Sequence, residues 1–263
     1  MSVEALSGKV FLLVTGASRG IGRQIAITFG SLLQEGSHIL LLARNLNALQ
    51  EVARSIPSKV TVDAVSIDLS KSTKVTLEET ISCSLNKATP DSFDRVVLIH
   101  NVGTFGDASK VANELTDLNI WREYYDLNVF IPIVLNAVVM NMFNRLTNIK
   151  KVVINLTSFY ATEAGYGCAF YSTSQAAREM FFKVFTLENP DVDILSYSAG
   201  VVETDMLYEV SENLVDLNSK KQYKELLATK TALTPEQTVN RLVEILRKHK
   251  YKSADHVDYY DKL

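Results

Sequence analysis

Residues 10–22 read Val10-Phe-Leu-Leu-Val-Thr-Gly16-Ala-Ser-Arg-Gly20-Ile-Gly22. The apolar run before Gly16 is short and uninterrupted, which is typical of a strand buried on both faces of a parallel sheet. Apolar residues at helical spacing follow: Ile21, Ile25, Phe29 and Leu32. A glycine cluster alone indicates only a tight turn, but between a strand and a helix it brings backbone N–H groups to a pyrophosphate. The residues predicted to bind it are Gly16, Ser18, Arg19, Gly20, Ile21 and Gly22.

Strand and helix patterns alternate along the rest of the chain. Apolar or alternating runs predict strands at 38–43, 60–66, 95–100, 151–157 and 192–198, with a last strand ending near Asp258. Helical patterns occupy 46–56, 74–86, 116–147, 171–187 and 235–248, and the polar helical stretch between Met206 and Thr234 is expected to be a mobile lid. The alternation predicts an α/β fold, a Rossmann-type doubly wound parallel sheet of about seven strands with helices on both faces.

We expect residues 1–263 to form a single domain. Its cofactor half is about 8–105, and its catalytic and substrate half is about 106–263.

The second strand indicates which dinucleotide binds. It ends in Arg44, and no Asp or Glu lies between His38 and Asn47. An acidic residue about 20 positions after the glycine turn would bind the ribose 2′-hydroxyl of NAD and repel a 2′-phosphate. The absence of such a residue, together with Arg19 and Arg44, predicts a clamp for the 2′-phosphate and therefore NADPH. The alternative is that both arginines are merely solvated.

A second stretch with chemical meaning runs from Ser158 to Gln175. Ser158 follows the apolar strand 151–157, and Tyr171 lies in the first turn of the next predicted helix. A hydroxyl and a phenol in these places can converge on one carbonyl oxygen, with Ser158 orienting it and Tyr171 donating a proton. The pair predicts carbonyl reduction.

These motifs resemble the short-chain dehydrogenase/reductase family over essentially the whole chain. The string Thr15-Gly-x-x-x-Gly-Ile-Gly22 and the spacing of Ser158 and Tyr171 carry the likeness. The resemblance implies that Asn128 holds a water in a proton relay, although an Asn within a helix is otherwise typical of a kink or a polar core contact. It also implies cofactor contacts from Asp68, Leu69, Asn101, Gly103, Tyr171, Gln175, Gly200, Thr204 and Met206. For Asp68, a helix-capping role is equally open.

The sequence departs from the family pattern at Gln175, because the family has a catalytic lysine four residues after the tyrosine. The family's lysine contacts the nicotinamide ribose and lowers the tyrosine pKa. Gln175 can still bond ribose hydroxyls but brings no charge, so we expect the pKa of Tyr171 to lie nearer its free value of about 10. Tyr171 is then protonated at neutral pH, as a reductase requires. Arg178, three residues further on, could compensate in part.

The C-terminal stretch narrows the resemblance to pterin-reducing members of the family. It reads Lys252-Ser-Ala-Asp-His256-Val-Asp258-Tyr-Tyr-Asp261. The likeness implies that Asp258 anchors a pterin, whose 2-amino and N3–H groups match the two oxygens of a carboxylate. It therefore implies NADPH-dependent reduction of a pterin side-chain carbonyl in tetrahydrobiopterin biosynthesis, with substrate contacts from Ser158, Tyr171 and Asp258. Asp258 could instead only cap the last strand.

Two other hypotheses stay open. One is a broader NADPH-dependent reductase of dicarbonyl or ketosteroid-like substrates. The other is a non-catalytic NADPH-binding protein, which the replacement of lysine by Gln175 suggests.

Composition limits the classes of partner. The chain has a formal net charge of −3 and a pI of about 5.9, which gives no basic surface for nucleic acid or an anionic membrane. No apolar run approaches the length of a membrane span, and the N-terminus lacks a signal-peptide pattern, so a reducing cytoplasm is expected. Two separate cysteines, Cys83 and Cys168, and four scattered histidines predict no metal site. The apolar stretches 129–143 and 171–187 predict a homodimer interface, with burial inside one subunit as the alternative.

Overall fold

Seven parallel strands form the sheet of this protein. A computed structural model describes residues 3–88, 93–144 and 148–262. The strand order is β3-β2-β1-β4-β5-β6-β7, which confirms the predicted doubly wound sheet. The strands are β1 (Val10–Thr15), β2 (His38–Ala43), β3 (Thr61–Ser66), β4 (Arg95–His100), β5 (Lys150–Thr157), β6 (Val192–Ser198) and β7 (Asp255–Asp258).

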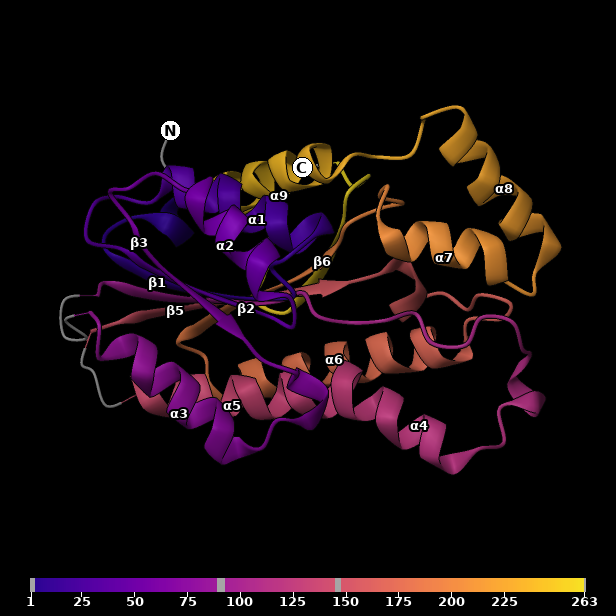
Figure 1. Cartoon of the computed structure of the whole chain (residues 1–263), viewed down its shortest axis with the longest axis horizontal. Helices are drawn as coiled ribbons and strands as arrows, with labels where there is room; N and C mark the ends of the chain where they lie inside the picture. The colour runs from indigo at the N-terminus through magenta and orange to yellow at the C-terminus, as the bar shows by residue number, and fades with distance from the viewer. Residues whose placement is uncertain (1–2, 89–92, 145–147, 263) are drawn as a thin grey trace.

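Helices cover both faces of the sheet (Figure 1). One face carries α1 (Gly20–Leu32), α2 (Leu46–Arg54) and α9 (Pro235–Lys248). The opposite face carries α3 (Lys74–Leu85), α5 (Ile131–Phe143) and α6 (Ala169–Glu188), and α4 (Leu118–Tyr125) extends that layer. The expected lid consists of α7 (Asp205–Asn213) and α8 (Leu217–Ala228), which project beyond the carboxyl ends of the strands.

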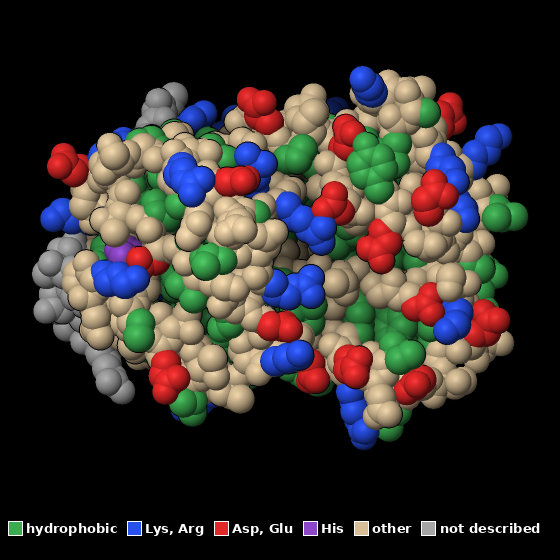
Figure 2. All heavy atoms as spheres, viewed as in Figure 1, with side chains coloured by type: hydrophobic (Ala, Val, Ile, Leu, Met, Phe, Trp, Pro, Cys, Tyr) green, Lys and Arg blue, Asp and Glu red, His purple; other side chains and the backbone are tan. Residues whose placement is uncertain are grey.

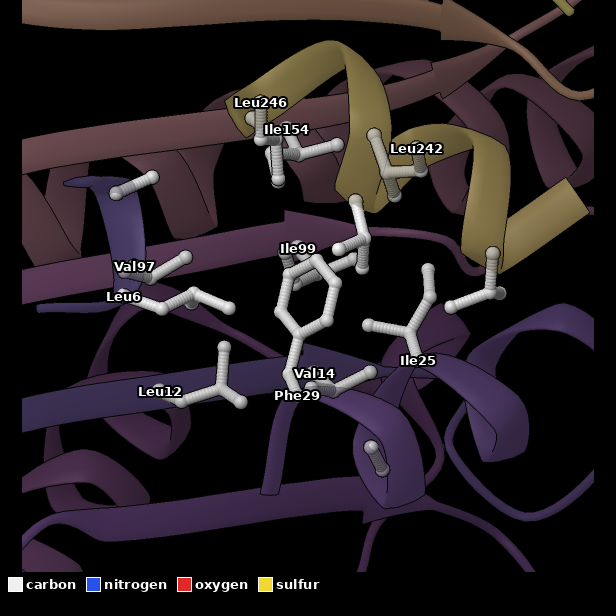
Figure 3. Close-up of a cluster of buried hydrophobic side chains, with 14 of the residues drawn as sticks. Leu6, Leu12, Val14, Ile25, Phe29, Val97, Ile99, Ile154, Leu242 and Leu246 are labelled. Atoms are coloured by element: carbon white, nitrogen blue, oxygen red, sulfur yellow. The ribbon is translucent and has the colours of Figure 1, made fainter. Parts of the chain in front are cut away.

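The core explains why the central strands are apolar throughout. Successive strand side chains point to opposite faces, so Leu12 packs under α1 and α9 while Leu13 packs under α3 and α5. Figure 3 shows the first of these layers, in which Ile25 and Phe29 of α1 point toward the strands. The predicted α1 stripe was wrong at one position, because Leu32 is 42% exposed and Leu33 is fully buried. Four-residue spacing from Ile25 and Phe29 leads to residue 33.

The long helical region predicted at 116–147 is divided by one π-helical turn, η5 (Asp126–Phe130), between α4 and α5. Residues 145–147 lie outside the described part of the chain. The run Leu118–Phe143 has 26 residues and is apolar enough to span a membrane by length and composition, which corrects the expectation that no such run exists. Because 56% of its most apolar window is buried inside the fold, we interpret it as a core helix.

Candidate active site

A cleft of about 1030 Å³ follows the carboxyl ends of the strands, between the sheet and the lid helices α7 and α8. Parallel strands bring the residues that follow them to one edge of the sheet, so this is the expected place for a ligand. In Figure 2 the surface is hollowed near the middle of the view, and both basic and acidic side chains border the hollow.

The glycine turn forms one wall of the cleft, to which it contributes Gly16, Ser18, Arg19, Gly20 and Ile21. The N-cap residue of α1 is Arg19, whose side chain makes no capping bond to the first N–H groups of the helix. Gly22 lies behind the turn, where a Cβ would stand 2.4 Å from both the Asn101 Nδ2 and the Gly16 carbonyl oxygen. The turn therefore fits an anion: its backbone is open toward the cleft, and its glycines allow close packing behind it.

Three predicted cofactor residues stand where the next two strands end. Arg44, Asp68 and Leu69 line the cleft after β2 and β3. Asp68 also caps the short turn η2 (Leu69–Lys71), because its Oδ1 accepts hydrogen bonds from the Ser70 nitrogen at 3.1 Å and the Ser70 hydroxyl at 2.7 Å. The capping alternative for Asp68 is thus correct, and the same residue faces the cleft.

The turn after β4 is held in place by two asparagines. Asn101 and Gly103 line the cleft, and the Asn101 amide donates to the carbonyl oxygens of Thr15 at 3.0 Å and Gly16 at 3.2 Å. Asn128, in η5, is 1% exposed and does not line the cleft. Its Oδ1 accepts from the Thr104 nitrogen at 2.8 Å. Asn128 therefore braces the turn, and its predicted water-binding role stays a prediction.

Ser158, Tyr171 and Gln175 line the same part of the cleft. Ser158 follows β5, and its Oγ accepts from the Tyr160 nitrogen at 3.2 Å. The ring of Phe105 stacks on that of Tyr171, with centroids 4.5 Å apart, which restricts the phenol to one orientation. The Gln175 Oε1 is buried and has no hydrogen-bond partner in the described part of the chain. A ribose hydroxyl would satisfy it.

The electrostatic environment of Tyr171 favours the protonated phenol. Burial raises the pKa of Tyr171 above its ordinary value of 10.0, whereas the neighbouring Ser158 hydroxyl, the Arg178 guanidinium and the Gln175 amide act in the opposite direction. The expectation of a pKa near the free value omitted burial and was too low. The expected protonation state at neutral pH is unchanged, because both values lie well above 7.

The loop after β6 and the end of β7 close the far side of the cleft with Gly200, Thr204, Met206 and Asp258. Gly200 has a φ of +75°, a conformation that favours glycine. The Asp258 Oδ2 accepts from the Ser198 hydroxyl at 2.5 Å, and its Oδ1 accepts from the Tyr260 nitrogen at 3.0 Å. Asp258 thus accepts bonds from the end of the sheet and also lines the cleft, and its pterin-anchoring role stays a prediction.

Several residues of the cleft were not predicted from the sequence. Phe105 is one, and another is the pair Tyr160 and Tyr223, whose hydroxyls lie 2.8 Å apart and join the turn after Ser158 to the lid helix α8. Proximity to Ser158 could have indicated Tyr160, whereas nothing in the sequence marks Tyr223. Within the described residues, no group of three or more His, Cys, Asp and Glu side chains is arranged to hold a metal ion.

Known proteins resemble this one over most of the chain. The family model described as short chain dehydrogenase matches residues 10–215. Sepiapterin reductase of Bos taurus is 31% identical over 258 residues, which are 97% of this chain and 96% of that protein. Benzil reductase ((S)-benzoin forming) of Bacillus subtilis is 25% identical over 241 residues, which are 90% of this chain and 93% of that protein.

Solved structures share the fold. That of L-sorbose reductase from Gluconobacter frateurii, complexed with NADPH and L-sorbose, has a TM-score of 0.76 and 24% identity, and the match covers 98% of this chain and 97% of that one. Since the family model also matches most of the sequence, the chain belongs to the short-chain dehydrogenase family.

Proposed function

We propose that this protein reduces a carbonyl group with NADPH, and that its substrate is the side-chain carbonyl of a pterin, a step of tetrahydrobiopterin biosynthesis. The observation that carries the proposal is that Ser158, which follows β5, Tyr171 of α6 and Asp258 of β7 line one cleft. Their arrangement offers a proton donor near one end of a substrate and a carboxylate for another part of it. Similarity to sepiapterin reductases over 97% of the chain supports the same assignment.

The cofactor site fits a nicotinamide dinucleotide phosphate. The glycine turn and the uncapped N-terminus of α1 suit the pyrophosphate. Arg19 and Arg44 suit the 2′-phosphate, and the Gln175 Oε1 suits a ribose hydroxyl. When bound, NADPH supplies the hydride that the carbonyl carbon receives.

The residues of the chain then handle the oxygen and its proton. Ser158 donates a hydrogen bond to the carbonyl oxygen and fixes its direction. Tyr171 gives its proton to the same oxygen as negative charge develops there, and burial keeps this phenol protonated at neutral pH. Phe105 holds the ring in place, and the Tyr160–Tyr223 pair covers the cleft from the lid side, which limits access of water.

Asp258 is suited to select the substrate. Ser198 and Tyr260 each donate one hydrogen bond to its carboxylate, so each oxygen keeps acceptor capacity toward the cleft. The 2-amino and N3–H groups of a pterin are two parallel donors at matching spacing. A small dicarbonyl has no such edge.

A broader carbonyl reductase is the second candidate. The aromatic side chains of Phe105, Tyr160 and Tyr223 form a lining that also suits flat non-pterin ketones, and the similarity to benzil reductase favours this possibility. A protein that binds NADPH without catalysis is the third candidate, because Gln175 brings no charge to the site.

The deciding experiment follows NADPH oxidation with sepiapterin and with a small diketone. Asp258→Ala should lower kcat/KM for sepiapterin about tenfold to a hundredfold, since a charge-assisted hydrogen bond is worth about 1.5–3 kcal/mol, and should spare the diketone. Asp255→Ala, an exposed acid on the same strand, is the matched control. Equal losses for both substrates would assign Asp258 to folding and favour the second candidate. NADPH binding without turnover of either substrate would favour the third.

A further inference from the structure

Arg178 is a buried cation whose hydrogen bonds do not neutralise it. It lies on α6 and is 1% exposed. In the part of the chain that the structure describes, its Nη2 donates to the carbonyl oxygens of His100 and Leu156, both at 3.2 Å, and to the Asn155 Oδ1. All three acceptors are neutral. Its Nε is buried without any partner among the described residues.

The adjacent carboxylate does not compensate this charge by bonding to it. Glu179 accepts instead from the Thr157 hydroxyl at 2.6 Å and contacts the His256 Nδ1 at 2.8 Å. Burial lowers the pKa of Arg178 to about 10, so the guanidinium is still charged at neutral pH. A buried cation without a bonded anion is costly to the fold, so its presence calls for an explanation.

The position of Arg178 on α6 explains why a cation is buried there. Tyr171, Gln175 and Arg178 follow each other at spacings of four and three residues, which places them on one stripe of α6, and all three line the cleft. The guanidinium reaches the carboxyl ends of β4 and β5, directly before the turn at Asn101 and the serine at 158. The guanidinium of Arg178 therefore lies beside the part of the cleft that Ser158 and Tyr171 line.

We propose that Arg178 is a positioning residue that acts through Tyr171 and supplies the positive charge that Gln175 lacks. This inference rests on the proposed role of Tyr171 as proton donor. When the O–H bond of Tyr171 breaks, its proton passes to the carbonyl oxygen and the phenol becomes a phenolate. The field of Arg178 stabilises that phenolate until water returns a proton to it.

The other groups that face Tyr171 cannot take this role. Ser158 at the end of β5 and Gln175 on α6 are neutral hydrogen-bonding partners, and the Cys168 thiol before α6 acts against the phenolate. The Tyr124 and Tyr223 phenols, from α4 and α8, are also neutral at ordinary pH, because burial raises the pKa of each. Of the groups that act on Tyr171, Arg178 is the one cation in the described chain.

The test is the pH dependence of alcohol oxidation, which needs the Tyr171 phenolate as base. A unit charge several ångströms from a phenol, at an effective dielectric of about 20, shifts the phenol pKa by roughly one to two units. Arg178→Gln, which keeps an amide donor for the strand oxygens but no charge, should move the alkaline limb upward by about that amount. Arg178→Lys should move it by less than about half a unit.

A merely structural role predicts a different result. Both variants would then lose thermal stability while the pH midpoint stays where it was, and that outcome overturns the proposal. If Arg178→Gln alone does not fold, Gln175→Lys is compared with Gln175→Lys/Arg178→Gln. A higher midpoint in the double variant, by a unit or more, supports the proposal, and equal midpoints overturn it.

A separate readout keeps this inference distinct from the proposed function. Absorbance titration of the tyrosinate, as the difference from Tyr171→Phe, is carried out on protein saturated with NADP and needs no substrate. It should show the same displacement in Arg178→Gln even if pterins are not reduced. If Tyr171→Phe reduces carbonyls as fast as the unmutated protein, the proton-donor assignment fails, whatever the titration shows.

Discussion

At the scale of single residues, Arg19 and Arg44 both line the cleft but differ in their ion pairing. Arg19 forms an ion pair with Asp205 at the start of α7, and the two side chains are 70% and 65% exposed. Such a pair contributes only about 0–1 kcal/mol, so a 2′-phosphate can replace the carboxylate. For Arg44 no ion pair occurs within the described ranges, so a phosphate in the cleft would have no carboxylate to displace from this guanidinium.

Arg44→Ala should raise the KM for NADPH and leave that for NADH nearly unchanged. The expected increase is about tenfold to a hundredfold, because one charge-assisted bond to the 2′-phosphate is lost. Initial rates with each cofactor at saturating carbonyl substrate measure it. Arg54→Ala, at the exposed end of α2, is the matched control. Equal increases in the KM for both cofactors would show that Arg44 supports the fold and does not bind the 2′-phosphate.

At the scale of elements, α6 holds β7 through a histidine–carboxylate contact beside the cleft. The His256 Nδ1 lies 2.8 Å from the Glu179 Oε1, which also accepts from Thr157 of β5. The bond to Glu179 raises the pKa of His256 above its ordinary value of 6.5. The contact joins three elements, and β7 carries Asp258 two residues further on. The position of the Asp258 carboxylate, which lines the cleft, thus depends on the α6–β7 contact.

This contact makes stability depend on pH in a defined direction. Because the folded pKa of His256 is raised, the stabilisation is fully present below the unfolded value of about 6.5 and is lost as pH rises through the folded value. The melting temperature of His256→Ala should therefore fall furthest below that of the unmutated protein below about pH 6.5, and the difference should shrink as pH rises through the raised pKa of His256. Thermal melts across this range measure the difference. A constant difference would mean that the imidazole acts only by packing.

At the scale of the whole molecule, one apolar stripe of α6 faces outward. Met180, Val184 and Leu187 are 59%, 45% and 82% exposed, and their spacing puts them on one side of the helix. Phe182 is fully buried, so the alternative of burial within one subunit is correct for that residue. We propose that a second copy of the chain covers the outward stripe and forms the expected homodimer.

Leu187→Glu should convert the dimer to a monomer, because an ionised carboxylate is costly to bury at an apolar interface. Light scattering after size-exclusion chromatography gives the mass directly. Val75→Glu, at a 59% exposed apolar position on α3, controls for added charge alone. A monomeric unmutated protein at micromolar concentration, or a Leu187→Glu variant that remains a dimer, would refute this interface.

Much of this molecule was determined by the sequence alone. Apolar runs mark the central strands and an alternating run marks β3, and Gly16, Arg44 and Ser158 directly follow strands that were predicted this way. Asp258 ends β7, which carries no apolar run and was located by the family resemblance. Since all the strands are parallel, their carboxyl ends meet at one edge, and local patterns sufficed to place these distant residues in one cleft. Asn128 could not be placed this way, because it lies within a helical run and braces the cleft from behind.

Only the tertiary structure decided what surrounds each of these residues. That Gln175 stands where the family pattern has a lysine is visible in the sequence, but the buried cation at Arg178 depends on which side of α6 faces the sheet. The hydroxyl contact between Tyr160 and Tyr223 joins elements 63 residues apart, and the raised pKa of Tyr171 depends on how much water the packed cleft displaces. No repeating pattern in the sequence encodes the distances between elements or the extent to which water is excluded, because both arise only when the elements pack together.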